Sequence, residues 1–282
     1  MTLSIYAIPE DVKSRLSITT SIDDAMILFY LNVASRMIDK HCSRHFYVEN
    51  GTYYFSPTNT EILFVPDLYS VNTLKNDLDG DGVYEDILSV NDYILTPLNR
   101  QTKSAINLKP DSGKYFNLTD LSSVEVDGLW GYVDTPLWFL SASSGLCTGS
   151  GETLTVDSLD TSLKVGMTIQ VEEEQCLITA IDTLLLTITV SRGLNGSTQI
   201  AHGSLGEGEE PDTLVPIYYA KFPEIISLVS ILIASRLLNS SGNEHIKSET
   251  LAGRSITYQD VNAGFMPYEE LALTPYVRMV YV

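Results

Sequence analysis

A short acidic segment has the residue spacing with the clearest chemical meaning in the chain. Asp77, Asp79 and Asp81 alternate with other residues, and Gly82 follows them. This spacing matches the first half of an EF-hand calcium loop, in which carboxylate oxygens converge on a hard cation and a glycine permits the sharp turn. The twelfth position, however, is Leu88 in place of a bidentate glutamate. Two hypotheses stand, a calcium site and an acidic hairpin turn, and the strand-like flanks favour the turn. Calcium is the only cofactor that these residues suggest.

The other titratable clusters lack the companions that catalysis requires. Glu172, Glu173 and Glu174 follow one another, so at most two share a face of a strand, and a solvated edge is the favoured interpretation. His41 and His45 have the spacing of metal ligands on one helix face, but no third ligand accompanies them. The sequence contains no P-loop, HExxH motif or nucleophile elbow. We therefore predict no catalytic residues and no enzyme activity.

Composition limits the partners of the chain. Its 282 residues include 36 acidic and 17 basic side chains, which gives a net charge of −19. Such a chain is not expected to grip nucleic acid, because phosphate binding needs clustered Lys and Arg, although an acidic wall would let a duplex slide past. The three cysteines are too far apart to indicate zinc or a disulfide framework. The most apolar window, residues 225–238, is too short to span a bilayer, so no membrane association is predicted.

Apolar periodicity predicts two long helices, at residues 22–41 and 223–238, and a short helix at residues 9–16. The first long helix has one apolar stripe at spacings of three and four, and a second stripe beside it. Burial on two sides suits a helix packed between its own domain and a neighbouring subunit, and a central core helix is equally compatible. The interface candidates on the second stripe are Tyr30, Val33 and Met37.

Short β-type runs separated by turn residues fill much of the chain between these helices. The expected fold is α+β: a small helical core of two long helices and a short N-terminal helix, with β-hairpin extensions and an inserted small all-β module. Residues 1–140 and 212–282 are expected to form the core, and residues 141–211 the inserted module.

The C-terminal tail, residues 245–282, contains too many large apolar side chains to remain in water. We expect it to dock on its own domain or on a partner. Its interface candidates are Phe265, Tyr268, Tyr276 and Val277.

Several modest motifs follow one another in an order that covers most of the chain. The first long helix ends in Ala34-Ser35-x-x-Ile38-Asp39-x-x-Cys42, and the proposed module contains Arg192-Gly193-x-Asn195-Gly196-Ser197. The other segments are residues 63–68, 79–85, 92–97, 124–132, 163–167 and 273–276. This ordered set resembles the head–tail connector proteins (adaptor or head-completion proteins) of tailed bacteriophages.

The resemblance implies a structural virion protein in the neck of the particle, assembled in the host cytoplasm. It implies a homo-oligomeric ring, expected to be a dodecamer, beneath the portal protein, with a stopper or tail-completion protein below. Such a ring extends the DNA channel, through which genomic DNA passes without sequence-specific binding, and offers the surface for tail attachment. Two alternatives stay open: another neck, baseplate or decoration protein of the virion, and a calcium-dependent binding module.

Overall fold

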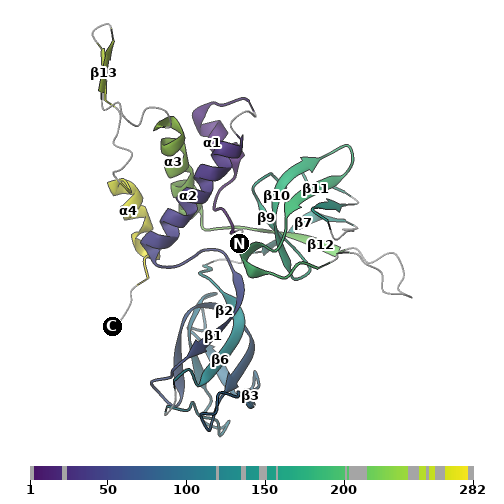
Figure 1. The fold of residues 1–282 in the computed structure, drawn as a ribbon, viewed down its shortest axis with the longest axis vertical. Coiled ribbons are helices and arrows are strands. Elements are labelled where there is room, and N and C mark those ends of the chain that lie inside the picture. The colour runs from purple at the N-terminus through teal and green to yellow at the C-terminus, as the bar shows by residue number, and fades with distance from the viewer. Residues whose placement is uncertain are drawn as a thin grey trace.

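The computed structural model of the protein describes residues 3–20, 24–118, 121–134, 138–145, 151–156, 158–200, 202, 215–240, 248–251, 254–257 and 264–278. These residues form a helical lobe and two β-lobes that meet near the N-terminal segment (Figure 1). Each lobe has its own cluster of buried apolar side chains. The chain therefore builds three small cores.

The first β-lobe is one antiparallel sheet in the order β1-β6-β2-β5-β4, with β3 paired to β2. Inward and outward residues alternate along β6, as expected for a sheet with one face on a core. Leu68, Leu74 and Trp130 are among the buried residues of this core. The strands are β1 (Glu49–Phe55), β2 (Ile62–Asn76), β3 (Asp86–Leu88), β4 (Tyr93–Thr96), β5 (Lys103–Leu108) and β6 (Val124–Trp130).

Strand β2 crosses a proline that the sequence pattern places in a turn. Pro66 lies between Phe64 and Leu68, where the pairing of β2 with β5 shifts register. Proline lacks the N–H that a sheet needs, and a bulge is where a strand tolerates it. The β-type runs at residues 62–65 and 70–75, which the sequence predicts as two short strands, are therefore one long strand.

The second β-lobe is an antiparallel sheet in the order β7-β12-β9-β10-β11-β8. Strand β7 crosses the module limit expected at residue 141, and β12 lies beyond the limit expected at residue 211. They pair with each other, and β12 also pairs with β9, so the sheet continues across both limits. The elements are β7 (Trp138–Gly145), β8 (Thr153–Thr155), β9 (Thr168–Val171), β10 (Glu174–Asp182), β11 (Thr187–Ser191), the 3-10 turn η1 (Leu194–Gly196) and β12 (Val215–Ala220).

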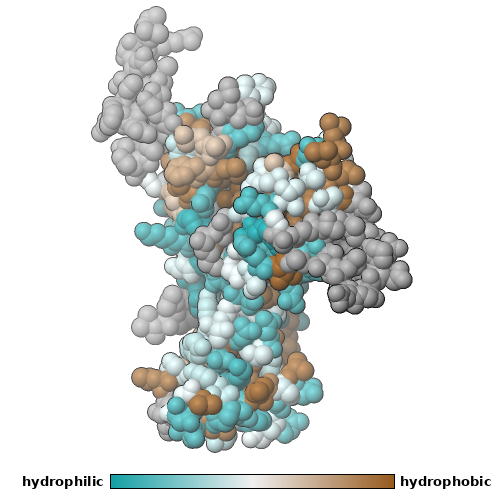
Figure 2. Space-filling view, turned by 45° about the vertical axis from the view of Figure 1, so that its right-hand side comes forward, coloured by the Kyte–Doolittle hydropathy of each residue, from teal (hydrophilic) through white to brown (hydrophobic). Residues whose placement is uncertain are grey.

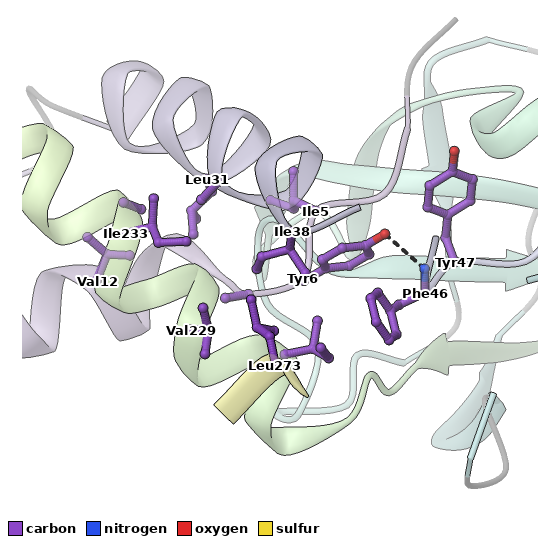
Figure 3. Packing of buried hydrophobic residues seen from close by; sticks show 14 of the residues in the cluster. Ile5, Tyr6, Val12, Leu31, Ile38, Phe46, Tyr47, Val229, Ile233 and Leu273 are labelled. Atoms are coloured by element: carbon purple, nitrogen blue, oxygen red, sulfur yellow. Dashed lines mark hydrogen bonds between the residues drawn. The ribbon is translucent and has the colours of Figure 1, made fainter. Parts of the chain in front are cut away.

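The helical lobe packs α2 (Asp24–Cys42) on α3 (Glu224–Ser240), with α1 (Pro9–Leu16) and α4 (Pro267–Leu273) against them. The stripe that the spacing of α2 predicts is fully buried: Ile27, Leu31, Ala34, Ile38 and Cys42. Figure 3 shows Leu31 and Ile38 facing Ile233, Val229 and Leu273. The 3-10 turn η3 (Thr274–Tyr276) follows α4, and β13 (Ser248–Leu251) pairs with β14 (Arg254–Thr257) in a separate hairpin.

The expected fold class was wrong. Among the described residues, fourteen strands stand against four α-helices, so the protein is mostly β and not a small helical core with extensions. The strand runs were interpreted as hairpins appended to the helices. They instead pair over long sequence separations, as β1 does with β6, and bury a core of their own. Local periodicity identifies such runs but carries no information on which distant run completes the sheet.

A buried network of polar groups joins the three lobes. The Asn195 side chain on η1 accepts a hydrogen bond from the Ser4 N–H at 2.9 Å, and its Nδ2 donates to Ser4 Oγ and to Gln175 Oε1, both at 2.8 Å. Gln175 Nε2 in turn donates to the Val48 carbonyl, where the chain enters β1, at 3.0 Å. Arg36 on α2 donates to the Ser4 carbonyl at 2.9 Å. The network thus ties the second β-lobe to the helical lobe and to the first β-lobe.

Replacing Asn195 by alanine should weaken this junction. The Ser4 N–H and the side-chain amide oxygen of Gln175, Oε1, lose a buried hydrogen-bond partner. Alanine must also adopt the left-handed backbone of Asn195, with φ of 52°. We expect a loss of about 2–4 kcal/mol in the free energy of unfolding, measured by urea titration. Asn32→Ala, at an exposed position of α2, is the control and should be near neutral. Equal stability of the two variants would contradict the role given to the network.

Candidate functional site

The acidic segment forms the connection between β2 and β3 and is organised around Asp77. This carboxylate is 4% exposed and accepts hydrogen bonds from the N–H groups of Gly80 at 2.7 Å and Gly82 at 2.9 Å. Burial acts to raise the pKa of Asp77, but the Gly82 and Gly80 N–H groups outweigh it and hold the pKa below its ordinary value. Gly82 has φ of 87°, a conformation that favours glycine. Asp77 therefore holds the turn in shape.

The structure brings together the three aspartates that the spacing singles out and adds Glu85 to them. The carboxylate oxygens of Asp77, Asp79, Asp81 and Glu85 lie within 4.8 Å of one another, and all but Asp77 are exposed. Leu88, at the twelfth position, is buried in the core of the first β-lobe and offers no ligand. The loop therefore combines a hydrogen-bonded hairpin turn with an open cluster of carboxylates.

A second titratable cluster lies inside the second β-lobe and is centred on Glu174. Its side chain is fully buried, and that of Arg192 is 5% exposed. Arg192 Nε and the Gly193 N–H donate to Glu174 Oε1, both at 3.0 Å, and the Ile200 N–H donates to Oε2 at 3.1 Å. Burial acts to raise the pKa of Glu174, but the hydrogen bonds from Arg192, Ile200 and Gly193 outweigh it and lower the pKa to about 2. The carboxylate is thus held ionised by donors on every side.

His202 lies fully buried between two carboxylates. Its Nε2 is 2.9 Å from Glu174 Oε2, and its Nδ1 is 2.9 Å from Glu172 Oε2. Ionised carboxylates only accept hydrogen bonds, so both ring nitrogens must donate for both contacts to be favourable. These two contacts fasten residue 202 to the turn before β10 and to the first residue of β10.

Glu174, Cys176 and His202 also place one potential metal ligand each within 4.8 Å. The Glu174 oxygens, however, already accept five hydrogen bonds, two of them from the Arg192 guanidinium, which would repel a cation. Both nitrogens of His202 are engaged as well. The residues present therefore fit an internal ionic network and do not fit a metal centre.

Glu172 and Glu173 are exposed, in the turn between β9 and β10, whereas Glu174 is buried, so the expectation of a solvated edge was wrong for Glu174. The sequence feature that could have indicated a buried carboxylate is Arg192, one of only two Lys or Arg residues between positions 141 and 211. A lone arginine in an acidic module has to pair with an acid that the sequence does not single out.

A third group fixes the N-terminal segment on α2. The Tyr6 hydroxyl donates to Asp39 and accepts from the Phe46 N–H at 3.0 Å, and Arg36 Nε lies 2.9 Å from Asp39 Oδ2. Burial raises the pKa of Asp39 to about 6, against the opposing effects of Arg36 and Tyr6. Each of these groups is engaged within the fold, so they serve packing.

The paired histidines considered as metal ligands do not share a site. The His41 ring packs on Phe265, with ring centroids 4.6 Å apart. His45 instead stacks on Tyr47 and contacts the Trp130 carbonyl through Nε2 at 3.2 Å. The helix ends between the two residues, at Cys42, and their rings serve different contacts.

The seven interface candidates divide into three groups. Tyr268 and Val277 are open to solvent, at 58% and 38% exposure. Val33 is half-buried on α2. The four that pack against the core of the helical lobe are Tyr30, Met37, Phe265 and Tyr276. The larger exposed side chains on the helices, Met26 and Phe29 on α2 and Leu271 on α4, were not among the candidates, because periodicity does not tell which stripe lacks a cover.

Comparison with known proteins gives no match to a protein-family model and none to a curated protein. Among the helices in the described ranges, none is long and apolar enough to cross a membrane. The function has to be argued from the surfaces and contacts of the chain.

Calcium should leave the thermal stability of the protein unchanged, because Asp77 is satisfied by backbone N–H groups and the twelfth ligand position is a buried leucine. The measurement is a melting curve in millimolar calcium and in chelator. Asp77→Ala should lower the free energy of unfolding by about 1–3 kcal/mol in both conditions, through loss of the two N–H partners. A rise in Tm with calcium that Asp81→Asn removes would establish the calcium site.

Acid should destabilise the protein partly through Glu174. Its pKa is lowered from 4.5 to about 2, so the stability it contributes is complete above pH 4.5 and is lost as the pH falls toward 2. This difference corresponds to about 3 kcal/mol. Glu174→Gln should lower stability at neutral pH and flatten the decline between pH 4.5 and 2, measured by urea titration at each pH. Glu173→Gln, an exposed neighbour, is the control, and equal slopes in the two variants would refute the assignment.

Proposed function

We propose that this chain is a structural subunit of a tailed-phage particle, a head–tail connector that assembles as a ring beneath the portal. In this role it extends the DNA channel and presents a surface for the tail. The observation that carries the proposal is the set of large apolar side chains that are exposed on all three lobes of a highly acidic chain. The resemblance of the ordered sequence motifs to head–tail connector proteins is the reason for proposing a tailed-phage particle.

On the helical lobe the most exposed of the large apolar side chains lie on α2 and α4, and α3 adds Leu228. Met26 and Phe29 on α2 are 46% and 57% exposed, and Tyr268 and Leu271 on α4 are 58% and 74% exposed. Figure 2 shows apolar atoms gathered over the helices and at the outer end of the second β-lobe. Single exposed apolar residues are ordinary, but clusters of them mark surfaces that another molecule covers. A subunit with neighbours on several sides accounts for such clusters.

The polar groups support the same proposal. In the described part of the chain, the buried titratable groups of Glu174, His202 and Asp39 are tied to neighbours within the fold. These contacts hold the lobes in shape, which is what a building block of an assembly requires.

Charge supports passage of DNA rather than binding. Residues 49–134, which include the first β-lobe, have 14 acidic and 5 basic residues, and residues 141–211 have 10 acidic and 2 basic residues. Acidic surfaces repel phosphate, so a duplex that passes them does not adhere. We therefore propose genomic DNA as a passing partner without sequence-specific contacts.

The rival within the same particle is a baseplate, other neck or decoration protein. Its apolar surfaces would also be covered by neighbours, but its binding site would lie away from the portal. The location of binding separates the two proposals.

Purified protein mixed with the portal protein of the same particle should bind at the narrow end of the portal ring, as seen by negative-stain imaging. Leu271→Ser on α4 should weaken this binding at least about tenfold, since burying one leucine contributes about 1.5–3 kcal/mol. Leu121→Ser, at an equally open position on the first β-lobe, is the control. Binding elsewhere on the particle, with none at the portal, would favour the rival.

A further inference from the structure

The hairpin between β10 and β11 ends in three consecutive leucines. Leu184 is 92% exposed, Leu185 is 70% exposed and Leu186 is 36% exposed. A run of open leucines at a turn is costly for a protein in water, where turns are usually polar. Figure 2 shows this apolar end of the second β-lobe standing away from the rest of the molecule.

The leucine tip, residues 184–186, is held in a defined shape. The Asp182 carboxylate accepts hydrogen bonds from the N–H groups of Leu184 at 2.9 Å and Leu185 at 3.0 Å. The Leu186 carbonyl accepts from the Val156 N–H at 2.9 Å, which anchors the tip to the end of β8. A tip fixed in this way loses little conformational entropy when it binds. It is a preformed protrusion.

The same chain has an apolar pocket of about 440 Å³ at the base of the second β-lobe, where that lobe meets α1 and α3. The exposed side chain of Leu228, at 48%, forms part of its wall. Other apolar residues of the wall are Ile5, Ile8, Met167, Phe222 and Ile231. Pockets of this size accept groups as large as small ligands, so the side chains of Leu184 and Leu185 are of suitable size.

The tip and the pocket of one molecule cannot meet. The tip is at the outer end of β10 and β11, whereas the pocket is at the inner end of the sheet, beside β9 and β12 (Figure 1). Two complementary surfaces at different places on one chain make a head-to-tail contact between copies. Such contacts close into rings when the rotation between neighbours permits.

Charge favours a second copy as the occupant of the pocket. Residues 141–211, which include the tip, have 10 acidic and 2 basic residues, while residues 49–134, which include the first β-lobe, have 14 acidic and 5 basic residues. The segments that build the helical lobe beside the pocket, residues 1–48 and 221–240, have 6 acidic and 7 basic residues. The pocket wall itself includes one basic and two acidic residues, Lys221, Asp11 and Glu224, so the acidic module of one copy meets weaker repulsion at the helical lobe of the next than at another acidic lobe.

We propose that Leu184 and Leu185 of each copy insert into the pocket beside Leu228 of the next copy and so set the head-to-tail contact of the ring. This inference rests on the proposed function, because it names the contact by which the connector ring closes. The second β-lobe then connects neighbouring subunits.

The test measures self-association of the full chain by sedimentation velocity over a range of concentrations. The wild type should form multiples of the 31.2 kDa chain, and Leu184→Ser combined with Leu185→Ser should shift the population to the monomer. Leu121→Ser is the control. It removes a leucine of similar exposure on the first β-lobe, and this variant should assemble as the wild type does.

A cross-link identifies the two surfaces directly. Leu185→Cys and Leu228→Cys are placed in separate chains, each with Cys147→Ser, which leaves the buried Cys42 and Cys176 as the other thiols. A short bismaleimide should give a dimer when the two chains are mixed and little dimer with either alone.

Three results would overturn the inference: a wild type that is monomeric at every concentration, a tip variant that assembles normally, or an absent cross-link in the mixture. A tip variant that assembles but fails to bind portal would place the tip against the portal instead. Assembly through the tip without any portal binding would leave this contact standing and overturn the connector proposal.

Discussion

The arrangement of the molecule depends on one buried junction, the network around Asn195. Three lobes with separate cores share only a small apolar cluster around Val48 and Val133, so polar contacts at their meeting point also fix their directions. Asn195, Ser4, Gln175 and the Val48 carbonyl link segments that lie up to 191 residues apart in sequence. Buried polar groups are costly unless each finds its partner, and this requirement admits few geometries. The junction therefore defines the angle at which the second β-lobe leaves the helices, and with it the position of the leucine tip.

The motif Arg192-Gly193-x-Asn195-Gly196-Ser197 has a structural explanation in these contacts. Arg192 pairs with Glu174 inside the lobe, Asn195 serves the junction, and the Ser197 hydroxyl accepts from the Gln175 N–H at 2.9 Å. Asn195 also has a left-handed backbone, which asparagine tolerates better than most residues. One short turn thus stabilises the module internally and fastens it to its neighbours. The sequence alone assigns no chemical role to this motif. The structure explains it by its contacts with β10 and with the N-terminal segment.

Sequence reasoning located the local features and missed the long-range ones. The stripe of α2 from Ile27 to Cys42 follows from helical spacing alone, and the turn at Asp77 follows from glycine and aspartate chemistry. The mostly-β architecture did not follow, because the pairing of Glu49–Phe55 with Val124–Trp130 depends on the whole chain. The ionic network at Glu174 was missed for the same reason: Arg192 and His202 reach it only after β10 and β11 have paired. The exposed leucines of the tip fall in a run, residues 184–190, that the sequence predicts as a strand, because apolar character alone does not distinguish buried from exposed side chains.

The two kinds of acidic cluster show how burial decides what a carboxylate does. At Glu174 the protein surrounds the charge with donors, so the group is held ionised and unavailable to a cation. At Asp79, Asp81 and Glu85 the charges face water, where mutual repulsion is screened and costs little. Neither arrangement pairs a free nucleophile with a base, and both stiffen a turn or a lobe. What remains available for function on the described surface is apolar area on the helices, at the leucine tip and, at positions such as Phe64 and Val90, on the first β-lobe. In a chain with a net charge of −19, neutral apolar patches are also the places where two copies can touch with the least electrostatic cost. Self-assembly through those patches is therefore the outcome that charge and burial favour together.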